Sequence, residues 1–328
     1  MQKLLTIVIP VYKVEEYINK CLDSLIIAPE LMKKMDVLIV NDGTPDRSAE
    51  ISREYVNRFP GLFRQIDKEN GGHGSVWNLG LKEAKGKYVR FLDSDDWVEN
   101  LDLLLDKLET CDAGLVITPT ICHLSGGGRW KLIIKDMEFG KVYDADTFDW
   151  LGNRSHGNYV LHHSCTYKTE ILRQLLPLFL EKQPYDDTIL GVASIIGARS
   201  LVAYDFVLYH YLMDREGQSI SKNVMKTSIE ARIKAQKAII AFVEEHPVDN
   251  QSSKHQFFMK KLPKMYNFGY KQLLFLPFDD SKKKVAEWDE WMSERDPGIH
   301  TDWQRLYRSI PFPLYRCIGR LCLHLLHR

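Results

Sequence analysis

The chain has 328 residues, and 44 lysine and arginine residues balance 44 aspartate and glutamate residues, so its formal net charge is zero. This balance excludes a global attraction to nucleic acid, and the 45% hydrophobic fraction suits one large or two smaller globular domains. Residues 1–13 are too short for a signal peptide, and no apolar run approaches the roughly 18 residues of a membrane span, so we expect a cytoplasmic protein.

Strand and helix patterns alternate in the first third of the chain. Four apolar runs are typical of buried strands: 4–12, 35–43, 63–72 and 87–96. The segments between them have apolar residues at helical spacing: 14–26, 48–59 and 75–86. This alternation predicts a doubly wound α/β sheet.

Polar residues follow each of the four predicted strands: Tyr12, Asn41 to Gly43, Asn70 to Gly72, and Asp93 to Asp96. Ligands of such sheets bind outside the carboxyl ends of the strands, so we expect all four clusters on one edge. Asp93, Asp95 and Asp96 would repel one another there. A divalent cation with a phosphate-bearing ligand would offset this charge. A solvated acidic turn or a helix N-cap is the alternative interpretation.

The pattern changes after residue 96. Two apolar segments, 113–124 and 129–136, flank a glycine-rich turn and predict a β-hairpin. A mixed α/β pattern continues to residue 222, and helical patterns then dominate. We therefore predict an α/β domain at 1–222 and a helical region at 223–328.

Six motifs in this order and spacing resemble family 2 glycosyltransferases of the GT-A fold: "IVIPVYKVEEYINKCLDSL", "VLIVNDGTPDRS", "KENGGHGSVWNLGL", "YVRFLDSDDWV", "PYDDTILG" and "YHYLMDREGQSIS". The resemblance covers residues 4–222. It implies a Rossmann-like mixed sheet and metal-dependent, inverting transfer of a hexosyl or N-acetylhexosaminyl group from a UDP-sugar to an acceptor hydroxyl. The expected cofactor is Mn²⁺ or Mg²⁺, and the expected pathway is cell-surface polysaccharide or glycan synthesis.

Two other functions stay open. A non-catalytic sugar-nucleotide-binding protein would keep the same fold. A sugar-nucleotidyltransferase is less favoured, because that class needs a glycine-rich phosphate loop after the first strand and "PVYKVEEY" contains no glycine.

The resemblance implies roles on the donor side. Asp95 would bind the metal directly, and Asp93 and Ser94 would contact the nucleotide, Asp93 on the ribose side. Asp42 would accept a hydrogen bond from the uracil imide, although an Asx-turn is an alternative role. The remaining donor contacts would come from the end of the first strand and from a glycine loop that lets backbone approach the uridine: Pro10, Val11, Tyr12, Asn70 and Gly71. Tyr12 as a plain core aromatic is the alternative.

This sequence departs from the family pattern at two places on the donor side. Asn41 replaces a usual acidic residue, and Trp77 stands where an arginine is common, so we assign Trp77 no ligand role.

On the acceptor side, the resemblance implies that Asp187 is the general base and that Asp186 belongs to the same catalytic pair. A helix start is the alternative interpretation of the two carboxylates. Arg215 would contact the diphosphate, in a segment that also includes Gln218 and Ser219.

Four histidines are assigned separately. His210 is a candidate third metal ligand or a satisfied core residue. We assign His73 to its own loop, and His162 and His163 to a strand.

The C-terminal segment 313–328 predicts an amphipathic helix. One stripe is apolar: Leu314, Ile318, Leu321 and Leu325. The opposite stripe is basic: Arg316, Arg320, His324 and His327. The helix either docks on the catalytic domain with its basic face solvated, or lies in an anionic membrane surface at the inner face of the cell membrane. The membrane alternative suits a lipid-linked acceptor.

Overall fold

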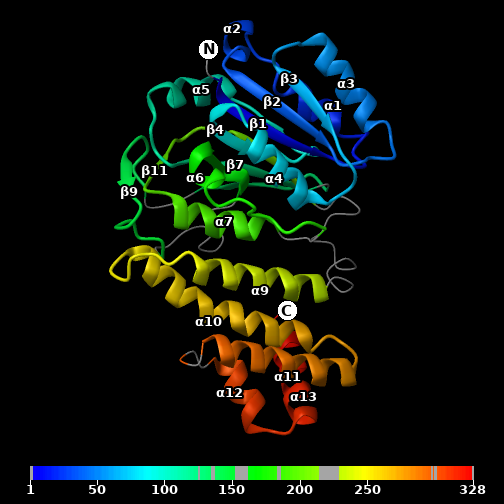
Figure 1. The fold of residues 1–328 in the computed structure, drawn as a ribbon, viewed down its shortest axis with the longest axis vertical. Coiled ribbons are helices and arrows are strands. Elements are labelled where there is room, and N and C mark those ends of the chain that lie inside the picture. Colours follow the sequence, from blue (N-terminus) through cyan, green and yellow to red (C-terminus); the bar gives the residue numbers. More distant parts are fainter. Residues whose placement is uncertain are drawn as a thin grey trace. The chain divides into compact units, whose positions relative to one another are not determined.

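The computed structural model describes residues 3–124, 126–133, 137–151, 162–182, 186–213, 229–296, 298 and 301–326. The chain divides into two compact units, Met1–Glu216 and Gly217–Arg328 (Figure 1). Among the described residues, no helix is both long and apolar enough to span a bilayer.

The first unit is built on an eight-stranded sheet with the order β3-β2-β1-β4-β10-β6-β11-β9. Its strands are β1 (Lys3–Val11), β2 (Met35–Asn41), β3 (Phe63–Asp67), β4 (Gly86–Phe91), β6 (Leu115–Ile117), β9 (Val142–Asp144), β10 (Cys165–Lys168) and β11 (Ser200–Ala203). The first four strands run parallel, whereas β10 pairs antiparallel with both β4 and β6. The predicted α/β class with a mixed central sheet is therefore confirmed.

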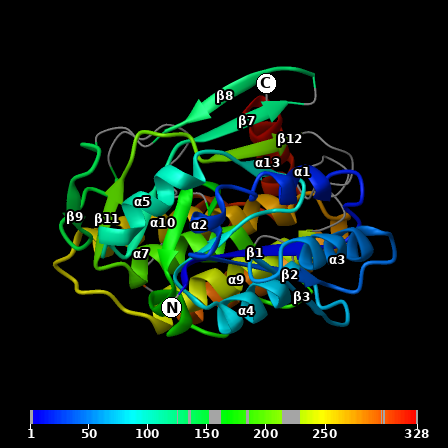
Figure 2. The same cartoon turned by 90° about the horizontal axis from the view of Figure 1, so that it is seen from above.

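A second, four-stranded sheet has the order β5-β12-β7-β8. Its strands are β5 (Trp97–Val98), β7 (Thr120–Leu124), β8 (Arg129–Leu132) and β12 (Tyr209–Met213). In Figure 2, β8, β7 and β12 lie side by side. The antiparallel pairing of β7 with β8 confirms the predicted hairpin. The predicted strand 113–124, however, is split between β6 and β7, which belong to different sheets.

The helices of the first unit follow the predicted order, with different ends. They are α1 (Ile18–Asp23), α2 (Pro29–Met32), α3 (Ser48–Arg58), α4 (His73–Glu83), α5 (Leu101–Thr110), α6 (Thr169–Arg173) and α7 (Asp186–Gly197). The predicted helix 14–26 shortens to α1. Helix α4 begins two residues earlier than predicted, so its first turn includes His73.

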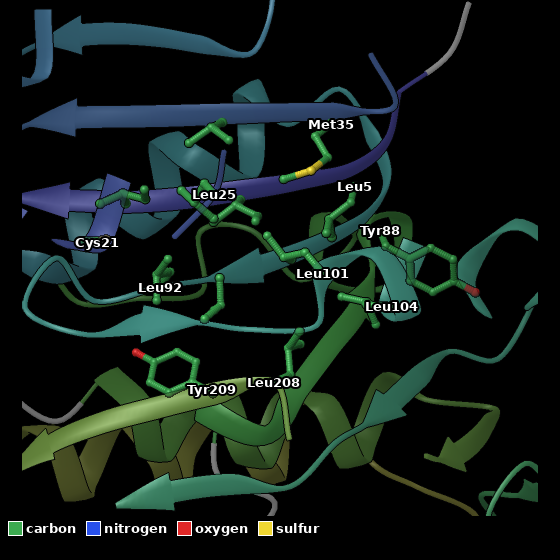
Figure 3. Packing of buried hydrophobic residues seen from close by; sticks show 14 of the residues in the cluster. Leu5, Cys21, Leu25, Met35, Tyr88, Leu92, Leu101, Leu104, Leu208 and Tyr209 are labelled. Carbon is green, nitrogen blue, oxygen red and sulfur yellow. The ribbon is translucent and has the colours of Figure 1, made fainter. Parts of the chain in front are cut away.

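Both faces of β1 are buried, which explains its continuous apolar sequence. One face contributes Leu5 to a core that also contains Leu25, Met35 and two leucines of α5, Leu101 and Leu104 (Figure 3). The other face packs against α4 at Gly80, where a Cβ atom would lie only 2.3 Å from Val8 Cγ1. The strand is thus held between two layers, and its carboxyl end is fixed in position.

The second unit is helical over its described residues. Its helices are α9 (Ile229–Glu245), α10 (Ser253–Leu273), α11 (Phe278–Arg295), α12 (Asp302–Ser309) and α13 (Phe312–Leu326). Trp288 of α11 is buried against α10 and donates its indole N–H to the carbonyl oxygen of Tyr266 at 3.1 Å. A Cβ atom at Gly269 would lie 2.1 Å from this indole, so a glycine allows the two helices to approach.

Helix α13 turns a different face inward from the one predicted. Tyr315 is fully buried, whereas Leu314 and Leu321 of the predicted apolar stripe are 49% and 62% exposed. Arg316 and Arg320, predicted to be solvated, donate hydrogen bonds of 2.6 and 2.9 Å to carbonyl oxygens of the α10–α11 turn. The leucine stripe is therefore not the face that packs within the second unit: the aromatic side chain and the guanidinium groups provide the contacts, although Arg320 stays exposed.

Candidate active site

The carboxyl ends of the parallel strands β1 to β4 form the predicted edge. The Asp42 amide donates to the Val11 carbonyl at 3.0 Å, and Asn70 Nδ2 donates to the Asp42 carbonyl at 3.0 Å. Tyr12 is 43% exposed at the end of β1, whereas Pro10 is half-buried and Val11 is buried. Tyr12 is therefore not a plain core residue, and its ring offers a surface for a flat base.

Asp42 holds the glycine loop that precedes α4. Its carboxylate accepts hydrogen bonds of 2.9 Å from the amides of Gly71 and Gly72 and an ion pair of 2.7 Å from Lys68 Nζ. Gly72 has φ +81° and ψ 170°, and a Cβ there would lie 3.0 Å from the backbone of Lys182. Only glycine suits this conformation and this close approach.

Asn41 forms the turn that was considered for Asp42. Asn41 Oδ1 accepts a hydrogen bond from the Thr44 amide at 2.9 Å. The carboxylate of Asp42 instead faces the glycine loop, so the Asx-turn alternative for Asp42 is wrong. A contact of Asp42 with uracil stays a prediction, and it would add one more donor to an already occupied carboxylate.

Asp93, the first residue of the D-x-D motif, lies against three imidazoles after β4. His73 Nε2 is 3.3 Å from Asp93 Oδ1, while His162 Nε2 and His163 Nε2 are 3.4 and 3.8 Å from Oδ2. Burial raises the pKa of Asp93, but hydrogen bonds and charge interactions with His162 and His73 outweigh it and hold this pKa well below its usual value. Burial also lowers the pKa of His163 well below its usual value, so this imidazole is neutral near pH 7.

The pairing of β10 with β4 explains why His162 and His163 lie next to Asp93. Tyr167 lies opposite Val89 in the antiparallel register, so the turn that precedes β10 lies next to the segment that follows β4. The fully buried Arg90 holds the turn by donating to the carbonyl oxygen of His163.

Three histidine assignments made from the sequence are therefore wrong. His162 and His163 form a short 3₁₀ turn, η1 (His162–Ser164), just before β10 and not a strand. His73 does more than serve its own loop, because its ring reaches Asp93 from the first turn of α4.

Asp96, the third carboxylate of the motif segment, is buried and bound to β12. Tyr209 Oη donates to Asp96 Oδ2 at 2.6 Å, and the Leu212 amide donates to Oδ1 at 2.8 Å. Tyr209 Oη also accepts from the Asp93 amide at 3.1 Å. Burial, then the charges of Asp95 and Asp93, raise the pKa of Asp96 well above its usual value. The N-cap alternative is wrong, because α5 begins only after β5 and the side chain of Asp96 binds β12.

Asp187 is exposed in the first turn of α7, which confirms that a helix starts at the two carboxylates. The side chain of Asp186 lies outside the described residues. Burial raises the pKa of Tyr211, and the charges of the D-x-D segment and of Asp187 raise it further. Tyr211 is therefore within electrostatic reach of both motifs.

His210 lies in the smaller sheet. Its ring stacks on Trp97 with centroids 5.0 Å apart, its Nδ1 is 2.8 Å from His123 Nε2, and its Nε2 is 3.3 Å from Glu99. The ring is therefore packed and paired through Nδ1, whereas its buried Nε2 makes no hydrogen bond of good geometry, and a metal role for His210 stays a prediction. Three further predicted site residues lie outside the described residues: Arg215, Gln218 and Ser219.

Comparison with known proteins adds a family and a fold. Residues 6–176, slightly more than half of the chain, match the family model described as Glycosyl transferase family 2. The glycosyltransferase GlyA of Streptococcus pneumoniae is 35% identical over 143 residues, which are 43% of this chain and 20% of GlyA. TarS of Staphylococcus aureus, a poly(ribitol-phosphate) beta-N-acetylglucosaminyltransferase, is 26% identical over 219 residues, 66% of this chain and 36% of TarS. The matched parts thus span well under half the length of both relatives.

Solved structures show the same fold at low sequence identity. TarS residues 1–349 in complex with UDP-GlcNAc superpose with a TM-score of 0.58 and 18% identity, covering 97% of this chain and 90% of that one. The mannosyltransferase PcManGT of Pyrobaculum calidifontis, in complex with GDP-Man and Mn²⁺, gives a TM-score of 0.51 at 14% identity, covering 98% and 87%. The GT-A fold expected from the sequence motifs is therefore confirmed.

Proposed function

We propose, because this chain belongs to glycosyltransferase family 2, that it transfers a sugar from a UDP-sugar to an acceptor hydroxyl with inversion at the anomeric carbon. One observation carries the proposal: the acidic D-x-D segment lies at the carboxyl end of β4, next to the glycine loop that Asp42 holds, within the part of the chain that matches the family model. This is the edge of the sheet at which a bound nucleotide would be held for direct transfer.

The donor side supports a nucleotide sugar held with a divalent cation. The structural relatives were solved with UDP-GlcNAc and with GDP-Man and Mn²⁺. In this chain, Asp95 is half-buried beside Asp93 at the end of β4, and carboxylate oxygens suit Mn²⁺ or Mg²⁺. When bound there, the cation would offset charge on the departing diphosphate. Tyr12 would cover the base, and the loop held by Asp42 would line the uridine.

The acceptor side supports a base-assisted attack. Asp187 is an exposed carboxylate on a rigid helix start, where it can accept the proton of an acceptor hydroxyl as that oxygen attacks the sugar. We propose a cell-surface glycan or a lipid-linked glycan as the acceptor; the relative TarS is named for transfer to poly(ribitol-phosphate).

The test is metal-dependent release of UDP from a panel of UDP-sugars, with UDP-GlcNAc tried first. We expect release with Mn²⁺ or Mg²⁺ and a loss of release in chelator. Asp187→Asn should leave UDP binding by calorimetry near normal and lower turnover by roughly 10²-fold or more. Asp186→Asn is the matched control. Loss of rate in the Asp186 variant alone would move the base by one residue, and full rate in both would exclude a base at this motif.

We also propose that the second unit contacts an anionic membrane surface. Large apolar side chains are exposed on the α10–α11 turn and on α13: Phe275, Phe278, Leu314 and Leu321. Arg316 lies over the ring of Phe278, and Arg320 is exposed on the same helix. A surface with exposed leucine and phenylalanine side chains next to arginine is typical of proteins that bind the interface of anionic lipid membranes.

Liposome sedimentation tests this second proposal. The intact chain should bind vesicles containing phosphatidylserine but not neutral vesicles, and high salt should weaken the binding. The double variant Leu314→Asp/Leu321→Asp should lose it. Leu103→Asp, at a leucine of α5 that is 43% exposed, is the matched control. Equal binding by the intact chain and both variants would place the membrane contact elsewhere. Absence of binding by all three proteins would reject the membrane proposal.

A further inference from the structure

We propose that Asp93, His162 and His163 form a binding site for a divalent transition-metal ion such as Mn²⁺, Co²⁺ or Zn²⁺. The inference deepens the proposed function and rests on it, because it names two ligands and a metal class that the D-x-D motif alone does not specify. It also gives Asp93 a direct part in holding the ion.

The spacing of the three ligand atoms is the first argument. One ring nitrogen of His162, one of His163 and a carboxylate oxygen of Asp93 all lie within 4.8 Å of one another. The two nitrogen–oxygen distances, 3.4 and 3.8 Å, exceed those of good N–H···O hydrogen bonds, which are about 2.7–3.2 Å. Ligand atoms about 2.1 Å from a shared ion, in octahedral or tetrahedral geometry, lie about 3.0–3.4 Å apart. Small inward movements of the three side chains would therefore bring their ligand atoms to the spacing that a shared ion requires.

The rigidity of the two imidazoles is the second argument. Their side chains are only 5% and 9% exposed, and their ring centroids are 3.7 Å apart. The ring of His162 packs edge-on against Trp77, and the ring of His163 stacks on Tyr211 at 4.2 Å. Arg90 holds the backbone of this turn through the carbonyl oxygen of His163. Ligands fixed before the ion arrives lose little entropy on binding it.

The chemical nature of the three ligands indicates which class of metal ion the site would bind. Two imidazoles and one carboxylate suit first-row transition ions, whereas Mg²⁺ prefers oxygen ligands and water. Three protein ligands leave positions for other oxygens, including those of a diphosphate. His73, 38% exposed and 3.3 Å from the other oxygen of Asp93, marks the solvent-facing side through which an ion can enter.

Titration with Co²⁺ in the absence of nucleotide tests the site directly, because Co²⁺ bound to histidine absorbs visible light. We expect visible bands on addition of Co²⁺ to the intact chain, displaced by Zn²⁺ and by a large excess of Mn²⁺ but not by Mg²⁺. The double variant His162→Ala/His163→Ala should weaken the Co²⁺ affinity by more than about 100-fold, beyond the cost of a lost outer-shell partner. His123→Ala, a histidine of the smaller sheet, is the control and should bind like the wild type.

The buried positions call for variants that keep the packing. His162→Phe and His163→Phe retain a ring against Trp77 and Tyr211 but carry no nitrogen, so they should lose the bands while circular dichroism stays unchanged. Wild-type Co²⁺ affinity in folded variants would overturn the inference, and Asp93 would then only lie in contact with the two rings. The proposed function fails separately: bands without UDP release reject the transferase activity, and UDP release with no such bands rejects this site.

Discussion

Removal of the Tyr209 hydroxyl is the sharpest test of how the acidic segment is held. The hydroxyl donates to Asp96 Oδ2 at 2.6 Å and accepts from the Asp93 amide at 3.1 Å, and the side chain is fully buried. Burial and the charges of Asp95 and Asp93 raise the pKa of Asp96, whereas the two hydrogen bonds to its carboxylate, from Tyr209 and from the Leu212 amide, lower it and so stabilise the ionised form in which the bond from Tyr209 is a charged one.

The structure sets the expected size of the effect. A hydrogen bond to a charged group contributes about 1.5–3 kcal/mol, and a buried amide left without a partner costs about 1–3 kcal/mol. Since the segment can relax in part, Tyr209→Phe should lower the free energy of opening of the first unit by about 2–4 kcal/mol. Hydrogen–deuterium exchange of the amides of β1 and β4 measures this free energy for the first unit alone.

Tyr88→Phe is the matched control. Tyr88 is also fully buried, but its hydroxyl faces two neutral carbonyl oxygens, those of Cys111 and Ala113, at 3.0 and 3.1 Å. Loss of the Tyr88 hydroxyl should lower the free energy of opening by about 1 kcal/mol. If Tyr209→Phe cost no more than Tyr88→Phe, the charged bond to Asp96 would not contribute as argued, and the segment would be held by other contacts.

Two glycines give further predictions, both measured by the same exchange experiment. Gly80→Ala would press a methyl group against Val8 and should cost about 1–3 kcal/mol, and the double variant with Val8→Ala should cost less than the sum of the single variants. Gly72→Ala should cost about 1–3 kcal/mol, because φ +81° with ψ 170° is a glycine conformation. Gly140→Ala is the control, because Gly140 also has a positive φ, +80°, but a Cβ there would have no atom within 4 Å. If Gly72→Ala lowered the free energy of opening no more than Gly140→Ala, the close approach of Lys182 would add no strain.

Short-range patterns in the sequence predicted the first four strands and the common edge at their carboxyl ends well. β1 is buried on both faces and reads as a continuous apolar run, and four parallel strands bring their following loops together. The helix ends were less predictable because caps are weak signals: α4 begins at His73, and its N-cap residue Gly72 provides no side-chain cap.

The histidine cluster could not be predicted from local pattern. His163 is remote from Asp93 in sequence, and the antiparallel pairing of β10 with β4 that joins them is a long-range choice. Only two facts together could have predicted the cluster: two adjacent histidines precede a buried strand, and that strand pairs with β4. The inward face of α13 was missed for a related reason, since Tyr315 and Gly319 pack where hydrophobic spacing alone favoured the leucines.

The three carboxylates after β4 lead to a last prediction, in which stability and function oppose each other. Asp93 is balanced by imidazoles and Asp96 accepts two donors, while the charge of Asp95 raises the pKa of both Asp96 and Tyr211. Asp95 therefore adds negative potential next to two other carboxylates. Asp95→Asn keeps the shape and removes this charge, so the first unit should be as stable as the wild type or more stable in amide exchange. The same variant should lose the increase in UDP affinity that Mn²⁺ gives in calorimetry. A clear loss of stability with metal-assisted binding intact would show that Asp95 holds the fold and that the cation is bound by other residues.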